Sequence, residues 1–214
     1  MTPQPIRLDI FADPVCPWCV IGKAELDLAL ERRPDHPFAI SWQPFQLNPE
    51  IPPSGMKHTD YMLAKFRDEA GIIAANRPVL EAGERLGLWF NMAAIERVPN
   101  TLDAQRLLHW AGQEGAQTHV MAGLMRAHWR EGRYLGNRDV LVEIASAVGM
   151  DGEVVRRLLA SDADRDTVLM REAHARERGI RSVPTFIVGD RHVVTGAQPA
   201  QLWLDVIDEL TGKG

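Results

Sequence analysis

Two cysteines, Cys16 and Cys19, are the residues of this chain whose type and spacing could do chemistry. An alternating run at 6–11 precedes them and predicts a strand, and an apolar stripe that begins at Val20 predicts a helix after them. Two side chains three positions apart on a first helical turn lie within disulfide reach. Pro17 fits such a turn, where backbone N–H groups lack partners, and those groups would stabilise a thiolate at Cys16. Cys19, one turn further in, is suited to resolve a mixed disulfide.

Three other interpretations of the cysteine pair remain open. A structural disulfide is disfavoured, because a loop of this length adds little stability. A zinc site would need a second pair of ligands, and the seven histidines show no matching spacing. Two inert buried thiols are the third alternative. The strand–CxxC–helix context favours thiol–disulfide chemistry over all three.

Composition indicates a globular protein. The 214 residues are 45% hydrophobic and 25% charged, with a formal net charge of −5 and both signs interspersed. This balance argues against nucleic acid or an anionic membrane as the main partner. The sequence contains no apolar run long enough to span a bilayer, and its first residues show no secretory signal. We therefore expect a cytoplasmic protein, where a CxxC pair is more often catalytic than structural.

The remaining pattern predicts an α/β protein. A second strand is expected at 38–42, parallel to the first, and a hairpin at 183–195 turns at Gly189-Asp190 with glycine in the first position. A final helix follows Pro199. This order predicts a thioredoxin fold, with a mixed four-stranded sheet and a large all-helical insertion. The predicted domains are a thioredoxin-like domain in two halves, 1–47 and 180–214, and a helical insertion domain, 48–179.

Within the insertion the periodicity predicts a series of helices. One carries Tyr61 to Glu69, a second covers 79–86, and others follow at 102–115, 118–130 and 137–149. Ser161 with Asp164 is expected to open the last helix of the block. His128 falls on the apolar stripe of the 118–130 helix, and we interpret it as a packing residue.

Several motifs together resemble the DsbA-like thioredoxin superfamily, and within it the FrnE type. In chain order they are Asp13-Pro14-Val15-Cys16-Pro17-Trp18-Cys19 with Ile21-Gly22-Lys23, Pro99-Asn100-Thr101, Gly136-Asn137-Arg138-Asp139-Val140-Leu141, Val183-Pro184-Thr185-Phe186 and Gly196-Ala197-Gln198-Pro199. The resemblance implies a disulfide oxidoreductase in which Cys16 attacks and Cys19 resolves. It also implies a cis peptide bond between Val183 and Pro184 that faces the cysteines and offers backbone groups to a substrate.

The same resemblance brings in relatives that use glutathione, the 2-hydroxychromene-2-carboxylate isomerases and kappa-class glutathione transferases. Those have a serine in place of Cys16, and an acidic residue after the last strand for glutathione. Thr195-Gly196-Ala197-Gln198 contains no such acid. We therefore expect no tightly bound cofactor, and leave glutathione open as a redox co-substrate. Asn100 matches a family motif near the active site and is assigned to substrate binding, with a helix cap as the alternative.

Residues between and before the cysteines refine the prediction. Pro17 and Trp18 place no charge beside the sulfurs, which favours a reduction potential near the ~−200 mV of glutaredoxin-like couples. Trp18 is expected to cover the reactive sulfur or contact substrate, although simple packing would also explain it. Asp13 is interpreted as shaping the turn, with proton transfer as the alternative.

The predicted function is thiol–disulfide exchange with a disulfide-containing protein or a small thiol, and a homodimer is left open. One alternative is a glutathione-dependent isomerase or transferase acting on a small aromatic substrate. A second alternative is a non-enzymatic chaperone that uses the CxxC to sense redox state or metal.

Overall fold

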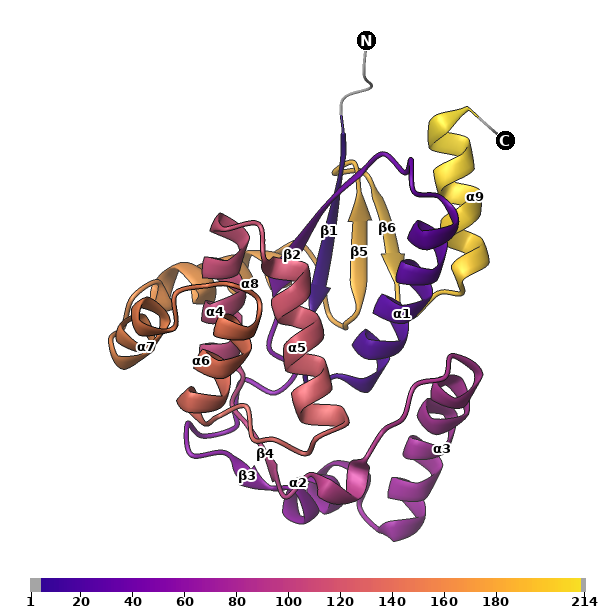
Figure 1. Cartoon of the computed structure of the whole chain (residues 1–214). Helices are drawn as coiled ribbons and strands as arrows, with labels where there is room; N and C mark the ends of the chain where they lie inside the picture. The colour runs from indigo at the N-terminus through magenta and orange to yellow at the C-terminus, as the bar shows by residue number, and fades with distance from the viewer. Residues whose placement is uncertain (1–4, 213–214) are drawn as a thin grey trace.

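The computed structural model describes residues 5–212, which form a central sheet with helices packed around it (Figure 1). The sheet order is β2-β1-β5-β6. Strand β1 pairs parallel with β2 and antiparallel with β5, and β5 pairs antiparallel with β6. The strands are β1 (Ile6–Ala12), β2 (Phe38–Pro44), β5 (Thr185–Val188) and β6 (His192–Thr195). This is the predicted mixed four-stranded thioredoxin sheet.

Two helices that flank the sheet in sequence pack against each other beside it. They are α1 (Pro17–Arg32) and α9 (Ala200–Thr211). The fully buried Trp203 of α9 meets Phe186 of β5 edge to face, with ring centroids 4.7 Å apart. Since α1 starts directly after the central strand, this packing holds the beginning of α1 against the end of the sheet.

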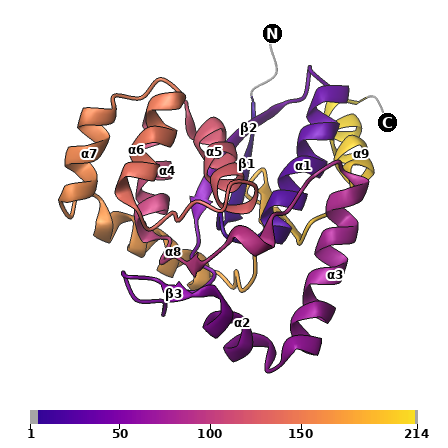
Figure 2. The same ribbon diagram turned by 60° about the horizontal axis from the view of Figure 1, so that its bottom comes forward.

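The segment between the two halves of the sheet is mostly helical. Its helices are α2 (His58–Phe66), α3 (Glu69–Arg85), α4 (Leu102–Gln113), α5 (Gln117–Trp129), α6 (Arg138–Ala147), α7 (Gly152–Ala160) and α8 (Arg165–Glu177), with a short 3-10 turn, η1 (Met92–Ala94). It also contains one short antiparallel pair, β3 (Met56–Lys57) with β4 (Arg97–Val98), so the prediction that the insertion is all-helical was wrong on this point. That pair closes a long excursion formed by α2 and α3, which returns so that α3 contacts α1 (Figure 2).

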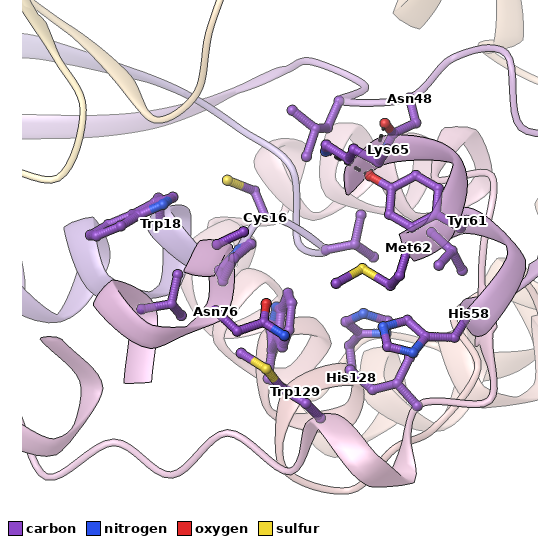
Figure 3. Close-up of a pocket in the computed structure, with 18 of the residues that line it drawn as sticks. Cys16, Trp18, Asn48, His58, Tyr61, Met62, Lys65, Asn76, His128 and Trp129 are labelled. Atoms are coloured by element: carbon purple, nitrogen blue, oxygen red, sulfur yellow. Dashed lines mark hydrogen bonds between the residues drawn. The ribbon is translucent and has the colours of Figure 1, made fainter. Parts of the chain in front are cut away.

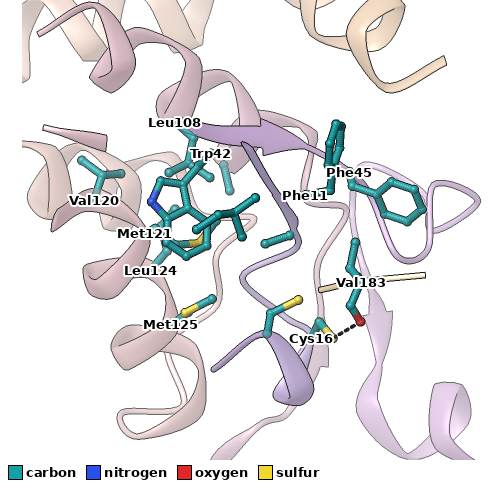
Figure 4. Close-up of a cluster of buried hydrophobic side chains, with 14 of the residues drawn as sticks. Phe11, Cys16, Trp42, Phe45, Leu108, Val120, Met121, Leu124, Met125 and Val183 are labelled. Atoms are coloured by element: carbon teal, nitrogen blue, oxygen red, sulfur yellow. Dashed lines mark hydrogen bonds between the residues drawn. The ribbon is translucent and has the colours of Figure 1, made fainter. Parts of the chain in front are cut away.

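The apolar core runs without interruption from the sheet into the helices. Trp42 of β2 lies among Leu108, Val120, Met121, Leu124 and Met125 of α4 and α5 (Figure 4). Its indole Nε1 donates a hydrogen bond to Thr118 Oγ1 at 3.0 Å, and its backbone N–H donates to Gln117 Oε1 at 2.8 Å. One shared core therefore joins the two parts, and their division into two domains stays a prediction.

Three further local predictions were wrong. The helix containing Tyr61 ends at Phe66, and Glu69 begins α3, because Asp68 accepts a hydrogen bond from the Gly71 N–H and starts a new helix. Asp164 precedes α8, but its side chain does not cap that helix and instead accepts from Trp110 Nε1. The β5–β6 turn has positive φ at both Gly189 and Asp190, which is the type I′ pattern rather than the glycine-first one.

Candidate active site

Cys16 lies where the central strand passes into α1. It is the N-cap of α1, in an extended conformation, and Pro17 occupies the first helical position. The backbone N–H of Cys16 donates to Asp13 O at 2.9 Å, which closes the turn between strand and helix. The sulfur is therefore held at the N-terminus of a 16-residue helix, where the positive end of the helix dipole favours an anionic group.

Both thiols are free and buried, but they differ in what they contact. Cys16 is 3% exposed and lines a cavity, whereas Cys19 is 1% exposed and lies behind it. The Cys16 thiol donates to the backbone carbonyl of Val183 at 3.6 Å (Figure 4). The Val183–Pro184 peptide bond is cis. The fold thus brings together two motifs that lie 167 residues apart.

Burial raises the pKa of the Cys19 thiol well above its ordinary value. A hydrogen bond to Cys16 and the charge of Cys16 raise it further, while a backbone hydrogen bond from Asp13 opposes these effects. Cys19 therefore holds its proton and can donate it toward the Cys16 sulfur. This arrangement favours Cys16 as the attacking sulfur and leaves Cys19 to act after a proton has been removed from it.

Asp13 lies beneath the turn and is completely buried. Its carboxylate accepts hydrogen bonds from the N–H of Val15 at 3.2 Å, the N–H of Leu47 at 2.6 Å and Thr101 Oγ1 at 3.1 Å. Burial raises its pKa to about 6 despite these three donors. Asp13 therefore shapes the turn, as interpreted from the sequence, and is also a titratable carboxyl group near neutral pH.

A cavity of about 310 Å³ opens beside Cys16 (Figure 3). Its walls come from the start of α1, the loop after β2, α2, α3, η1, the end of α5 and Val183. Most lining side chains are apolar or aromatic, and the aromatic ones are Trp18, Tyr61, Phe66 and Trp129. Trp129 also donates from Nε1 to Pro14 O at 3.0 Å, which ties α5 to the cysteine turn. The size and lining suit a small organic molecule.

Two histidines lie in the wall of this cavity. His128 is 3% exposed, and its Nδ1 has no hydrogen-bond partner. Burial, with the charge of a protonated His58 as a smaller cause, lowers the pKa of His128 to about 3. Burial also lowers the pKa of His58. Both rings are therefore neutral at physiological pH.

The residues assigned to the site from sequence occupy three kinds of position. Cys16, Pro17, Trp18 and Val183 line the cavity. Trp18 is 38% exposed, so it sits at the edge of the cavity rather than in the core. Cys19 and Pro184 lie behind this surface, and a Cβ added to Gly22 would come within 3.0 Å of Pro184 Cγ.

Asn100 lies apart from the cavity lining. Its Oδ1 accepts from Gln46 Nε2 at 3.1 Å and from the N–H of Leu102 at 3.0 Å, and its Nδ2 donates to Ile51 O at 2.7 Å. These contacts fasten the loop after β2 to the start of α4. They fit the helix-cap alternative, so substrate binding by Asn100 stays an untested prediction.

Sequence reasoning missed the two cavity histidines. A signal for His128 was present, because it lies on the apolar stripe of α5 with Val120, Leu124 and Met125. A histidine at such a position is more often a satisfied core residue, and the unpartnered Nδ1 appears only in the folded structure. His58 begins α2, and no periodic signal connected it with the cysteines.

The comparison with protein-family models identifies a DSBA-like thioredoxin domain over residues 7–208. The chain belongs to this family. Uncharacterized protein YwbO of Bacillus subtilis (strain 168) is 27% identical over 193 residues, which cover 90% of each chain. The structure is also similar to that of the probable DsbA oxidoreductase SCO1869 from Streptomyces coelicolor, with a TM-score of 0.85, 27% identity and coverage of 98% of this chain and 91% of the other.

A second solved structure shows the same fold at lower identity. It is the cytosolic disulfide reductase DsbM from Pseudomonas aeruginosa with GSH, with a TM-score of 0.67, 18% identity and coverage of 96% of this chain and 99% of the other. In this chain, none of the helices within residues 5–212 is long and apolar enough to cross a membrane. Over the same residues, no cluster of three or more His, Cys, Asp or Glu side chains could hold a metal ion.

Proposed function

We propose that this protein is a FrnE-type thiol–disulfide oxidoreductase, with Cys16 as nucleophile and Cys19 as resolving cysteine. The observation that carries the proposal is the placement of Cys16, at the N-terminus of α1, on the cavity and 3.6 Å from the Val183 carbonyl. Membership of the DSBA-like family supports it.

The exchange proceeds in two steps. Cys16 thiolate attacks one sulfur of a disulfide, so that a mixed disulfide forms and the other sulfur leaves as a thiolate, which then takes a proton. Cys19 then loses its proton and attacks the Cys16 sulfur, which forms the Cys16–Cys19 disulfide and releases the second thiolate. Two electrons pass from the dithiol to the substrate. A small thiol such as glutathione restores the dithiol by the reverse exchange.

Asp13 is the candidate proton acceptor for the second step. Its carboxyl group interacts electrostatically with Cys19, and its pKa of about 6 leaves it mostly ionised at neutral pH. In this proposal Pro17 and Trp18 contact the substrate at the rim of the cavity. The Val183 carbonyl loses its hydrogen bond from Cys16 when that thiol ionises, and it then accepts one from the substrate. Asn100 keeps the β2 loop in place behind them.

The setting of the reaction is part of the proposal. DsbM is described as cytosolic and was solved with GSH, which supports a cytoplasmic location here and glutathione as a redox co-substrate. The partner is a disulfide-containing protein or a small thiol compound. The proposal requires no tightly bound cofactor and no second copy of the chain.

Two substitutions test the assignment of the cysteines. Cys16→Ser should abolish reduction of insulin and of glutathione disulfide, whereas Cys19→Ser should accumulate mixed disulfides that mass spectrometry detects. Reduction that survives Cys16→Ser would rule out the nucleophile. Glu31→Ala, at an exposed position near the far end of the same helix, serves as the control and should exchange at the wild-type rate.

A glutathione-dependent isomerase or transferase is a second candidate. The aromatic lining of the cavity favours it, because Trp18, Tyr61, Phe66 and Trp129 could hold an aromatic substrate. Calorimetry separates the two candidates. Tight binding of reduced glutathione by the Cys16→Ser protein would favour the isomerase or transferase, and weak binding would favour exchange.

A further inference from the structure

Two buried carboxyl groups are connected through the loop that follows β2. Asp13 belongs to the cysteine turn and Glu172 to α8, and both are buried. The N–H of Gln46 donates to Glu172 Oε1 at 3.0 Å, and the N–H of the next residue, Leu47, donates to Asp13 Oδ2 at 2.6 Å. A buried carboxylate that lacks hydrogen bonds is costly. The position of this short stretch of backbone therefore affects both carboxyl groups.

Arg176, one turn further along α8, completes the attachment of this loop. Its guanidinium donates to Glu172 Oε1 from Nη2 at 2.6 Å and from Nε at 3.2 Å. Nη2 also donates to Gln46 O at 2.6 Å, and the guanidinium carbon lies 4.1 Å from the centre of the Phe45 ring. The Gln46 carbonyl and the Leu47 N–H belong to one planar peptide group. The pair on α8 therefore fixes the direction of the N–H that reaches the cysteine turn.

Glu172 acts on Asp13 in two opposing ways. Burial is the largest cause that raises the pKa of Asp13, the Leu47 N–H is the largest cause that lowers it, and the charge of Glu172 adds to the rise. By holding the loop, Glu172 favours the ionised form of Asp13, and by its charge it favours the protonated form. A second titratable group that interacts electrostatically with Asp13 is Cys19, on α1.

We propose that Glu172 is a positioning residue for the resolving step. It keeps the Leu47 N–H directed at Asp13, and its charge strengthens Asp13 as a proton acceptor. Asp13 then takes the proton that Cys19 must lose before it attacks. A proton acceptor works best when its proton affinity matches the working pH, and Glu172 adjusts that affinity from α8. This inference deepens the proposed function and rests on it, since it requires Asp13 to accept that proton.

The resolving step can be followed in a single turnover of the reduced protein with an equal amount of 4,4′-dithiodipyridine. Cys16 attacks this disulfide, which forms a mixed disulfide and releases one 4-thiopyridone. Cys19 passes its proton to Asp13 and attacks the Cys16 sulfur, which forms the Cys16–Cys19 disulfide and releases a second 4-thiopyridone. Two electrons leave the protein, each product takes up a proton, and Asp13 returns its proton to the solvent. Absorbance of the product rises in two phases, and the second reports resolution.

Glu172→Gln removes the charge and can keep the contacts. The three hydrogen bonds from Gln46 and Arg176 all reach Oε1, which the amide oxygen can replace. The pH profile of the second phase should therefore move to lower pH. At about pH 5 its rate, relative to its own plateau, should be about threefold the wild-type value, which corresponds to a shift of about half a pH unit. Glu177→Gln, the same substitution at an exposed position of α8, is the matched control and should leave the profile unchanged.

Arg176→Lys should move the profile in the opposite direction. It keeps a cation near Glu172 but lacks the planar guanidinium that spans Glu172 and the Gln46 carbonyl. The Leu47 N–H is then held less firmly, so Asp13 ionises at higher pH. Opposite shifts in the two variants support the inference, because a general loosening of the loop would move both profiles to higher pH. Two shifts in the same direction, or an unchanged profile in Glu172→Gln, would overturn it.

A titration that involves no sulfur chemistry separates this inference from the redox proposal. The carbon-13 NMR signal of the Asp13 carboxyl group, assigned by its loss in Asp13→Asn, is followed against pH in the reduced protein. Its midpoint should lie at lower pH in Glu172→Gln than in the wild type. If that shift occurs but no disulfide is exchanged, the redox role fails and the link from Glu172 to Asp13 stands. Equal midpoints refute the link whatever the exchange assay shows.

Discussion

The buried carboxyl group of Asp13 should make the stability of this protein depend on pH in a defined way. Its pKa is 3.8 when it is exposed and about 6 in the folded protein. Below the lower value it is protonated in both states, and above the upper value it is ionised in both. Since the folded state binds the proton more tightly, the free energy of unfolding falls as pH rises from about 4 to about 6. At about 1.4 kcal/mol for each pKa unit, the loss is about 3 kcal/mol.

Asp13→Asn removes this dependence because an amide does not titrate. The substitution also has a constant cost. The N–H groups of Val15 and Leu47 and the hydroxyl of Thr101 donate to the two carboxylate oxygens, and one of these becomes an NH₂ group. We expect that cost to be about 1–3 kcal/mol at every pH. The wild-type protein should therefore lose about 3 kcal/mol relative to the variant between pH 4 and pH 7, whatever the constant offset.

Titration of His128 also changes the free energy of unfolding, over a pH range that overlaps that of Asp13, but it makes the protein more stable as the pH rises. Its pKa is 6.5 when exposed and about 3 when folded, so the unfolded state binds the proton more tightly. Its contribution to stability is complete above about pH 6.5 and is lost as pH falls toward about 3. Because His128 is present in both the wild type and Asp13→Asn, its effect cancels in their difference.

The assay is urea unfolding followed by tryptophan fluorescence, at steps from about pH 4 to about pH 7.5, with both cysteines kept reduced. Thr101→Val is the companion variant. The Thr101 hydroxyl lowers the pKa of Asp13, so its removal should extend the fall in stability to higher pH. Parallel pH profiles for wild type and Asp13→Asn would refute the reasoning, because they would show that Asp13 titrates alike in the folded and unfolded states.

Three further substitutions test other parts of the structure. Gly22→Ala places a Cβ 3.0 Å from Pro184 Cγ. Urea unfolding should therefore show that the free energy of unfolding falls by about 1–3 kcal/mol, which outweighs the ~1 kcal/mol gain in helix propensity. Equal or higher stability of the variant would contradict this contact. Arg106→Lys should cost about 2–4 kcal/mol, since the buried guanidinium donates to three backbone carbonyls at the end of α7 and in its link to α8; a loss below 1 kcal/mol would contradict it. His128→Phe should remove most of the fall in the free energy of unfolding that occurs as the pH drops from about 6.5 to about 3. If the same urea titrations show an unchanged fall, His128 is not held neutral in the folded protein.

Much of the thioredoxin framework could be predicted from the sequence, because its signals are local. Alternating apolar residues marked β1 and β2, and Pro17 after Cys16 marked the start of α1. These patterns report which face of a strand or helix is buried, and that depends on residues close together in the chain. At Asp68 and Asp164 the sequence did not show which donor each carboxylate would bind. Asp68 accepts from the Gly71 N–H and starts α3, whereas Asp164 accepts from Trp110 Nε1 and does not cap α8.

The environment of the site was decided only by tertiary structure. Leu47 and Thr101 bring their donors to Asp13 from distant segments, and their contacts together with burial set its pKa. His58 and His128 belong to helices separated by α3 and α4, yet they meet in one cavity wall beside Cys16. Desolvation depends on everything packed around a group, which no local pattern encodes. The sequence by itself thus determined which sulfur chemistry the chain could perform, whereas the folded structure decided which groups surround the reacting sulfur.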